Sequence, residues 1–185
     1  MMPELSLHIL DVAQNSIKAG ANFIQIMVDV SFQKDALTIH ISDNGCGMTK
    51  EMVNKVFDPF YTTRTTRNIG LGIPFFEYAA KATGGTLTID SIPCEGTKLT
   101  AIFVLSHIDR MPLGDLASTM HTLITLNTNI DFYYTYQVNG KHFTLNTMEF
   151  REILGDVSFD LPDISRYIKE YLVENHSDIN EGQYI

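Results

Sequence analysis

The chain has 185 residues, of which 44% are hydrophobic and 19% charged, and these proportions exclude an intrinsically disordered protein. The formal net charge of −9 leaves no basic face for neutralising phosphates, so we expect no general nucleic-acid binding. No stretch approaches the roughly 18 consecutive apolar residues of a membrane span, and the N-terminus lacks the basic start of a signal peptide, so we expect a cytoplasmic protein without membrane contact.

Residues 1–105 alternate between helical and strand patterns. Leu5, Ile9 and Val12 recur at helical spacing before Gly20, which is typical of a helix that ends at a glycine. The next segments are predicted as strands at 23–32 and 36–42, a short helix at 50–57, a polar stretch at 58–70, a helix at 70–83, and strands at 86–92 and 97–106. Consecutive strands with short links pair antiparallel, so we expect an α+β fold, a two-layer α/β sandwich, rather than a doubly wound parallel sheet.

Residues 106–185 form a second, more acidic segment. They carry five Lys or Arg against twelve Asp or Glu, a net of −7, whereas residues 1–105 carry eight against ten, a net of −2. Helices are predicted at 111–126, with Pro112 in the first turn, at 146–154 and at 163–175, and a hairpin at 132–146 turns at Asn139-Gly140. We expect a small α/β C-terminal extension that packs on the sheet, forms a homodimer, or docks a partner protein.

The stretch SDNGCGM, residues 42–48, ends the second strand in an unusual way. An Asp followed by two glycines favours neither strand nor helix, so it is either a tight turn or a loop whose carboxylate and bare backbone hold a ligand. Its Cys46 and the other cysteine, Cys94, lie in no metal-ligand spacing, and two thiols are a weak indication of a disulfide framework. We expect both cysteines to have structural or packing roles.

Two further polar groups stand out. On the first helix, Asn15 lies in an otherwise apolar row with Asp11 and Lys18 one turn away on either side, so its amide needs a partner or a metal ion. The sequence IGLG at 69–72 opens the third predicted helix, where glycines let backbone N–H groups approach an anion. Taken singly, each feature is equally compatible with a solvated helix face or an ordinary turn.

The order of these motifs resembles a known family. LDVAQNSIKAGA, DNGCGM, VFDPFYTTR, IGLGI and EGTKLT follow one another as the N, G1, F, G2 and G3 boxes do in the GHKL superfamily of gyrase B subunits, MutL proteins, histidine kinases and related protein kinases. The resemblance covers about residues 4–105 and is strongest to sensor histidine kinases. It implies a histidine kinase-like ATP-binding domain at 1–105 with the Bergerat fold, a mixed, mostly antiparallel sheet with helices on one face.

The resemblance also implies ATP and Mg²⁺ as cofactors and gives each polar group a role. Asp43 would accept a hydrogen bond from the adenine amino group, with Thr97 assisting through its hydroxyl, while Asn15 would coordinate Mg²⁺. Gly45 and Gly47 would let the loop pass close to the base. The phosphates would be contacted by Lys18, by the backbone at Gly70, Leu71 and Gly72, and by Arg64 or Arg67 from a short lid.

The chain departs from the family pattern at three places. Asn68 stands where the G2 box usually has an extra glycine, the lid is short, and no histidine lies in the H-E/D-x-R/K-x-x-P setting of a phospho-acceptor. We therefore expect no autophosphorylation in cis. Asp11 occupies the position where gyrase, MutL and anti-sigma kinases carry a catalytic Glu, and it is either a catalytic base or a surface or Mg²⁺-shell carboxylate.

These observations leave two functions open. The first is an ATP/Mg-binding signalling protein that acts in trans, as a protein kinase or slow ATPase, on an unidentified regulatory partner. The alternative is a non-catalytic module in which nucleotide orders the lid and switches a protein interaction. A MutL-like role in DNA repair is disfavoured by the acidity and the small size of the chain.

Overall fold

The computed structural model describes residues 2–58, 72–155 and 157–181, which form one sheet covered by helices. In chain order the elements are α1 (Leu5–Lys18), β1 (Phe23–Ser31), β2 (Ala36–Asp43), α2 (Lys50–Lys55), α3 (Gly72–Ala82), β3 (Thr86–Ile92), β4 (Gly96–Val104), α4 (Leu116–Leu126), β5 (Asp131–Val138), β6 (Lys141–Asn146), α5 (Thr147–Leu154) and α6 (Pro162–Asn180). None of the helices in these described ranges is long and apolar enough to cross a membrane.

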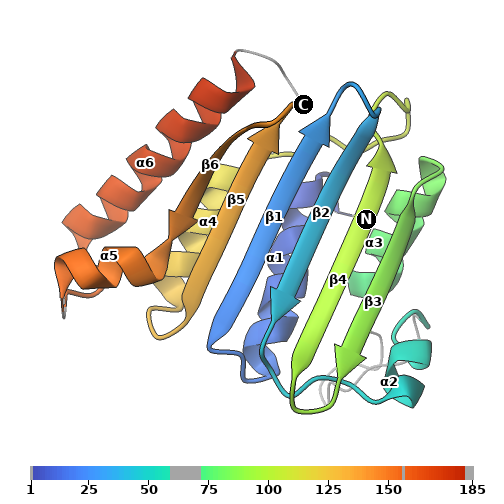
Figure 1. Ribbon diagram of the computed structural model, residues 1–185, viewed down its shortest axis with the longest axis horizontal. Coiled ribbons are helices and arrows are strands. Elements are labelled where there is room, and N and C mark those ends of the chain that lie inside the picture. The colour runs from blue at the N-terminus through green and yellow to red at the C-terminus, as the bar shows by residue number, and fades with distance from the viewer. Residues whose placement is uncertain (1, 59–71, 156, 182–185) are drawn as a thin grey trace.

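The sheet has the order β3-β4-β2-β1-β5-β6, and its strands are antiparallel except for one pair. β1 and β5 run parallel, with Ile24 opposite Phe132 and Val30 opposite Val138. The sheet therefore continues from residues 1–105 into residues 106–185 without a break (Figure 1). The expected α+β sandwich with a mixed, mostly antiparallel sheet is confirmed, and the second segment supplies two of the strands.

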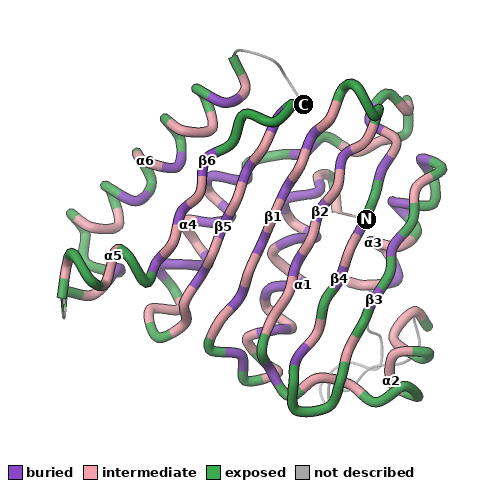
Figure 2. Tube along the Cα trace, in the orientation of Figure 1, coloured by how far each residue is buried: buried purple, intermediate pink, exposed green. Residues whose placement is uncertain are grey.

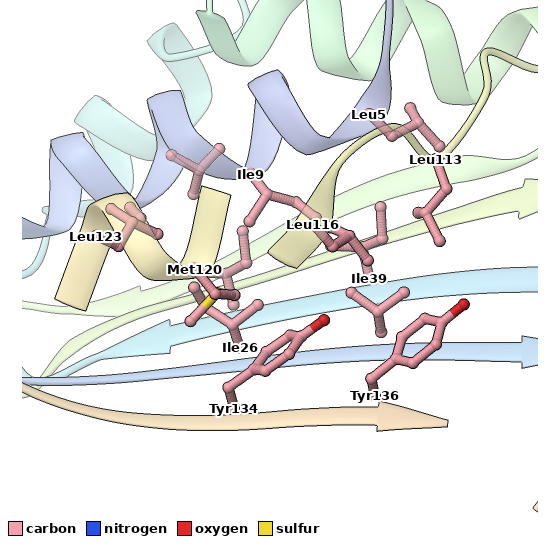
Figure 3. Packing of buried hydrophobic residues seen from close by; sticks show 14 of the residues in the cluster. Leu5, Ile9, Ile26, Ile39, Leu113, Leu116, Met120, Leu123, Tyr134 and Tyr136 are labelled. Atoms are coloured by element: carbon pink, nitrogen blue, oxygen red, sulfur yellow. The ribbon is translucent and has the colours of Figure 1, made fainter. Parts of the chain in front are cut away.

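Burial alternates along the strands and separates the two faces of the sheet (Figure 2). In β1 every second residue is buried, as expected for a strand with one face against a core. Figure 3 shows Ile26 and Ile39 of the sheet facing Ile9 of α1 and Met120 and Leu123 of α4. The helices α1, α3 and α4 lie behind the sheet in Figure 1, so this apolar layer is the core.

The helix expected at residues 111–126 begins later, at Leu116, so this prediction of its start is wrong. Its N-cap is Asp115, whose side chain accepts a hydrogen bond from the backbone N–H of Ser118 at 2.8 Å. The carbonyl groups of Pro112 and Leu113 instead accept the first two N–H groups of α1, at 3.0 and 2.9 Å. These N–H groups have no partner within their own helix, so residues 112–113 cap α1 instead of starting α4.

The helix α6 packs on β5 through an imidazole. His176 forms a hydrogen bond between its Nε2 and the hydroxyl of Tyr134 at 2.9 Å, and its ring stacks on Tyr136 with the centroids 4.5 Å apart. The Tyr136 hydroxyl donates to Asn180 at 2.6 Å. Burial lowers the pKa of His176 to about 4, and the nearby Asp115 carboxylate only partly opposes this shift. The imidazole is therefore neutral in the folded protein at neutral pH.

This buried imidazole makes stability depend on pH. Between pH 6.5 and about pH 4 the unfolded chain binds a proton at His176 that the folded protein does not, so the free energy of unfolding falls as the pH drops through that window. We expect His176 to contribute a loss on the order of 3 kcal/mol. Urea unfolding across this pH range should give a shallower slope for His176→Gln than for the wild type, whereas His142→Gln, at an exposed position, should keep the wild-type slope. Equal slopes for His176→Gln and the wild type would contradict the assignment.

Candidate functional site

Asp43 lies at the end of β2, where it pairs with Ile24 of β1 and Thr97 of β4. Its carboxylate is half-buried and accepts two hydrogen bonds. The hydroxyl of Ser16 on α1 donates to Oδ2 at 2.6 Å, and the backbone N–H of Gly45 donates to Oδ1 at 2.9 Å. The orientation of the carboxylate is therefore set by the protein itself, and each oxygen keeps a lone pair for a further donor.

The loop after Asp43 is held by its neighbours. Asn44 closes the turn, because its side-chain oxygen accepts the N–H groups of Asn22 and Phe23, both at 3.0 Å. Gly47 has a φ of +63°, and a Cβ there would overlap the carbonyl of Ile92, so only glycine fits this conformation and this approach. Asn44 and Asp43 both bond the turn, and each oxygen of the Asp43 carboxylate still has a lone pair for a further donor.

Thr97, at the start of β4, belongs to a small hydroxyl cluster. Its Oγ1 lies 2.9 Å from the Oγ of Ser91, which also donates to the carbonyl of Gly96 at 2.9 Å. The N–H of Met48 donates to the same Ser91 Oγ at 2.8 Å. Ser91 thus joins the loop after β2 to the β3–β4 hairpin, and through it Thr97 is positioned beside Asp43 in the neighbouring strand.

A polar row on α1 leads away from Asp43 toward the start of α3. Asp11 and Asn15 are four residues apart and lie on the same face of the helix, both half-buried. A Cβ at Gly72 would overlap the Asp11 carboxylate, so the first turn of α3 directly contacts Asp11. The Asn15 amide makes no hydrogen bond with any residue that the structure describes, and Lys18 is exposed in the last turn of α1.

One turn before Asp11, His8 lies inside the core. It is 1% exposed, and its ring stacks on Phe76 of α3 with the centroids 4.9 Å apart. Burial lowers the pKa of His8, although the neighbouring Asp11 carboxylate acts in the opposite direction. Neither ring nitrogen has a hydrogen-bond partner in the described part of the chain, so a neutral imidazole here serves as a packing group between α1 and α3.

The expected site residues that the structure describes lie around α1. One group is connected to its C-terminal half by the hydrogen bond between Ser16 and Asp43, and consists of Asp43, Gly45, Gly47 and Thr97. The other group lies along one side of the helix and consists of Asp11, Asn15 and Gly72. Four expected phosphate contacts fall outside the described residues: Arg64, Arg67, Gly70 and Leu71. The sequence interpretation missed Ser16 and Ser91. The helical spacing of Ser16 after Ile9 and Val12 indicates a position facing the core, but nothing in the sequence indicates its contact with Asp43.

Comparison with protein families gives a match of more than half of the chain. Residues 3–107 match the family model described as histidine kinase-, DNA gyrase B-, and HSP90-like ATPase. The matched region contains every site residue considered above, from Asp11 to Thr97.

Individual relatives with this similarity are sensor kinases. The sensor histidine kinase WalK of Bacillus subtilis is 33% identical over 97 residues, which is 49% of this chain and 16% of that protein. The sensor protein kinase FleS of Pseudomonas aeruginosa is 34% identical over 97 residues, 52% of this chain and 24% of that protein. The match thus spans less than a quarter of the length of either relative.

A solved structure supports the architecture over a larger part of the chain. The N-terminal domain of a DNA repair protein superposes with a TM-score of 0.59 at 16% identity, and the match covers 80% of this chain and 53% of that chain. At this identity the likeness concerns the fold alone, whereas the family is given by the match over residues 3–107. The chain belongs to the family of histidine kinase-, DNA gyrase B- and HSP90-like ATPases.

Proposed function

We propose that the chain binds ATP with Mg²⁺ and that Asp43 selects adenine. The observation that carries this proposal is the half-buried Asp43 carboxylate, oriented by Ser16 and Gly45 at 2.6 and 2.9 Å. An oriented carboxylate accepts a hydrogen bond from the exocyclic amino group of adenine. Guanine would present a carbonyl oxygen at that point, so the remaining lone pair of the carboxylate would face an acceptor instead of a donor, which costs affinity.

The polar row on α1 suits the phosphates and the metal ion. The side-chain amide of Asn15, which has no hydrogen-bond partner among the described residues, offers a hard oxygen. Mg²⁺ commonly takes one or two protein ligands and completes its shell with phosphates and water. No group of three or more His, Cys, Asp or Glu among the described residues could hold a metal ion by itself. This favours an ion that arrives with the nucleotide. Lys18 and the N-terminus of α3 at Gly72 supply positive potential for the phosphates.

The relatives support a role in signalling. WalK and FleS are sensor kinases, and residues 3–107 of this chain match the ATPase family model. The chain would act in trans on a regulatory protein partner, as a protein kinase or a slow ATPase, with residues 106–185 as the docking or dimerising part. Asp11 lies against the first turn of α3, where it would orient an attacking water or hydroxyl group as a general base.

The substitution Asp11→Asn tests the proposed role of Asp11 as a general base. An amide cannot accept the proton, so we expect the rate of ATP turnover or phosphoryl transfer to fall about 100-fold or more. The affinity for Mg-ATP should stay within about threefold of the wild type, because Asp11 would act in the transition state rather than in ground-state binding. Calorimetry gives the affinity, and phosphate release or transfer to a co-purified partner gives the rate.

Asp90→Asn is the matched control for this experiment. It exchanges an exposed carboxylate on β3, outside the proposed docking part, and should leave both quantities unchanged. If wild-type protein bound Mg-ATP but neither hydrolysed nor transferred it, and Asp11→Asn preserved function in cells, the enzymatic role would be lost. The nucleotide-switched binding module would then be the function that fits.

A further inference from the structure

Cys46 and Cys94 lie on two segments that run side by side. The backbone N–H of Cys94 donates to the carbonyl of Cys46 at 2.8 Å. The neighbouring residues continue this arrangement in the antiparallel sense, since Gly47 packs against the carbonyl of Ile92 and Met48 donates to the Ser91 hydroxyl. Cys94, in the β3–β4 turn with a φ of 65°, thus lies beside Cys46, whose own N–H donates to the carbonyl of Ala19 at 2.9 Å. In the sequence 48 positions separate the two cysteines.

Both cysteines are exposed, so the expected packing role is wrong, whereas a structural role stays a prediction. Neighbouring residues on adjacent antiparallel segments have their Cα atoms about 4.5–5.5 Å apart, whether or not they exchange both backbone hydrogen bonds. A disulfide spans Cα separations of about 4.4–6.8 Å. The backbone hydrogen bond therefore holds the two Cα atoms at a separation that a disulfide can bridge, and solvent exposure leaves both thiols accessible to an oxidant.

We infer that Cys46 and Cys94 are a redox modification site that forms a reversible intramolecular disulfide with a hydroperoxide as the oxidant. One thiolate attacks the O–O bond of the hydroperoxide, which yields a sulfenic acid and releases an alcohol or water. The second thiolate attacks the sulfenic sulfur, the S–S bond forms, and the oxygen leaves as water. The two thiols together lose two protons and two electrons, and the hydroperoxide takes up both.

The disulfide would tie the loop after β2 to the β3–β4 turn. The ring that it closes runs from residue 46 to residue 94 and contains α2 and α3, and closing a ring of this size restricts the unfolded chain strongly. The tie would hold the loop only three residues from Asp43. An effect on ligand binding would rest on the proposed function, but formation of the bond does not.

Treatment of the reduced protein with one equivalent of hydrogen peroxide tests this inference. We expect the intact mass to fall by two hydrogen atoms without any interchain dimer, and the thermal unfolding midpoint to rise by about 5 °C or more. Dithiothreitol should reverse both changes. Cys46→Ser and Cys94→Ser should each abolish the mass loss and the rise, while the midpoint of each reduced variant stays near that of the wild type.

Several results would overturn the inference: oxygen added to the separate thiols, disulfide-linked dimers, or an unchanged unfolding midpoint in the oxidised protein. Calorimetry with Mg-ATP on the reduced and oxidised forms is a separate measurement. An absence of ATP binding would contradict the proposed function and leave the disulfide result standing.

Discussion

Replacing Asp43 by Asn should abolish adenine nucleotide binding, with the dissociation constant for Mg-ATP rising about 100-fold or more. In the protein the carboxylate accepts the Ser16 hydroxyl and the Gly45 N–H. An Asn side chain has one accepting oxygen in place of two, so either an internal donor or the adenine amino group would lose its acceptor. Isothermal titration calorimetry with ATP, ADP and GTP measures the effect directly.

Two further variants separate recognition from folding. Asp90→Asn makes the same chemical change at an exposed carboxylate on β3 and should bind ATP as the wild type does. Ser16→Ala removes only the hydroxyl that orients Asp43 and should weaken binding about tenfold. If the Asp43→Asn protein were folded and its ATP affinity unchanged, the whole nucleotide-site interpretation would fail.

A chain that ends after His107 should not fold cooperatively, although it contains the entire family match. The truncation removes α4, whose Met120 and Leu123 are fully buried against α1 and the sheet, and β5, which carries the buried Tyr134 (Figure 3). Each fully buried side chain of this size contributes about 1.5–3 kcal/mol. These three side chains alone account for about 4.5–9 kcal/mol, which is comparable to the roughly 5–15 kcal/mol by which a domain is stable.

Circular dichroism and urea unfolding would measure this result. A chain ending at Glu181 is the control, because it retains every helix and strand described here, and it should unfold at the wild-type midpoint. A cooperative transition in the shorter chain, together with ATP binding, would contradict the expectation. Residues 106–185 would then be a separable unit, as a domain boundary at residue 105 implies.

Most individual elements could be predicted from the sequence because their patterns are local. The alternating apolar residues of β1 and β2 and the helical spacing in α1 agree with the structure. Asn139 and Gly140 both have positive φ, of 49° and 87°, as the predicted type I′ turn requires. The late start of α4 could not be predicted, because Pro112 is well suited to a first helical turn and its carbonyl is instead used by α1, more than 100 residues away.

The candidate site could likewise be predicted only in part. Asp43, Asn15 and Thr97 were recognised through motifs with characteristic neighbours, and the register of β2 and β4 places Asp43 beside Thr97. The contributions of Ser16 and Ser91 depend on contacts between elements far apart in the chain. No periodicity or spacing in the sequence encodes such contacts, so only the fold reveals them.

The parallel pairing of β1 with β5 also has a consequence for the order in which the protein folds. During synthesis β1 emerges with β2, but its second neighbour follows roughly 100 residues later. Until then β1, a central strand of the sheet, has unpaired backbone N–H and C=O groups along one edge. The apolar side chains next to this edge are not yet covered by α4. We therefore expect the pairing of β1 with β5 to be a late, long-range step of folding, and the chain to be most prone to aggregation before that step.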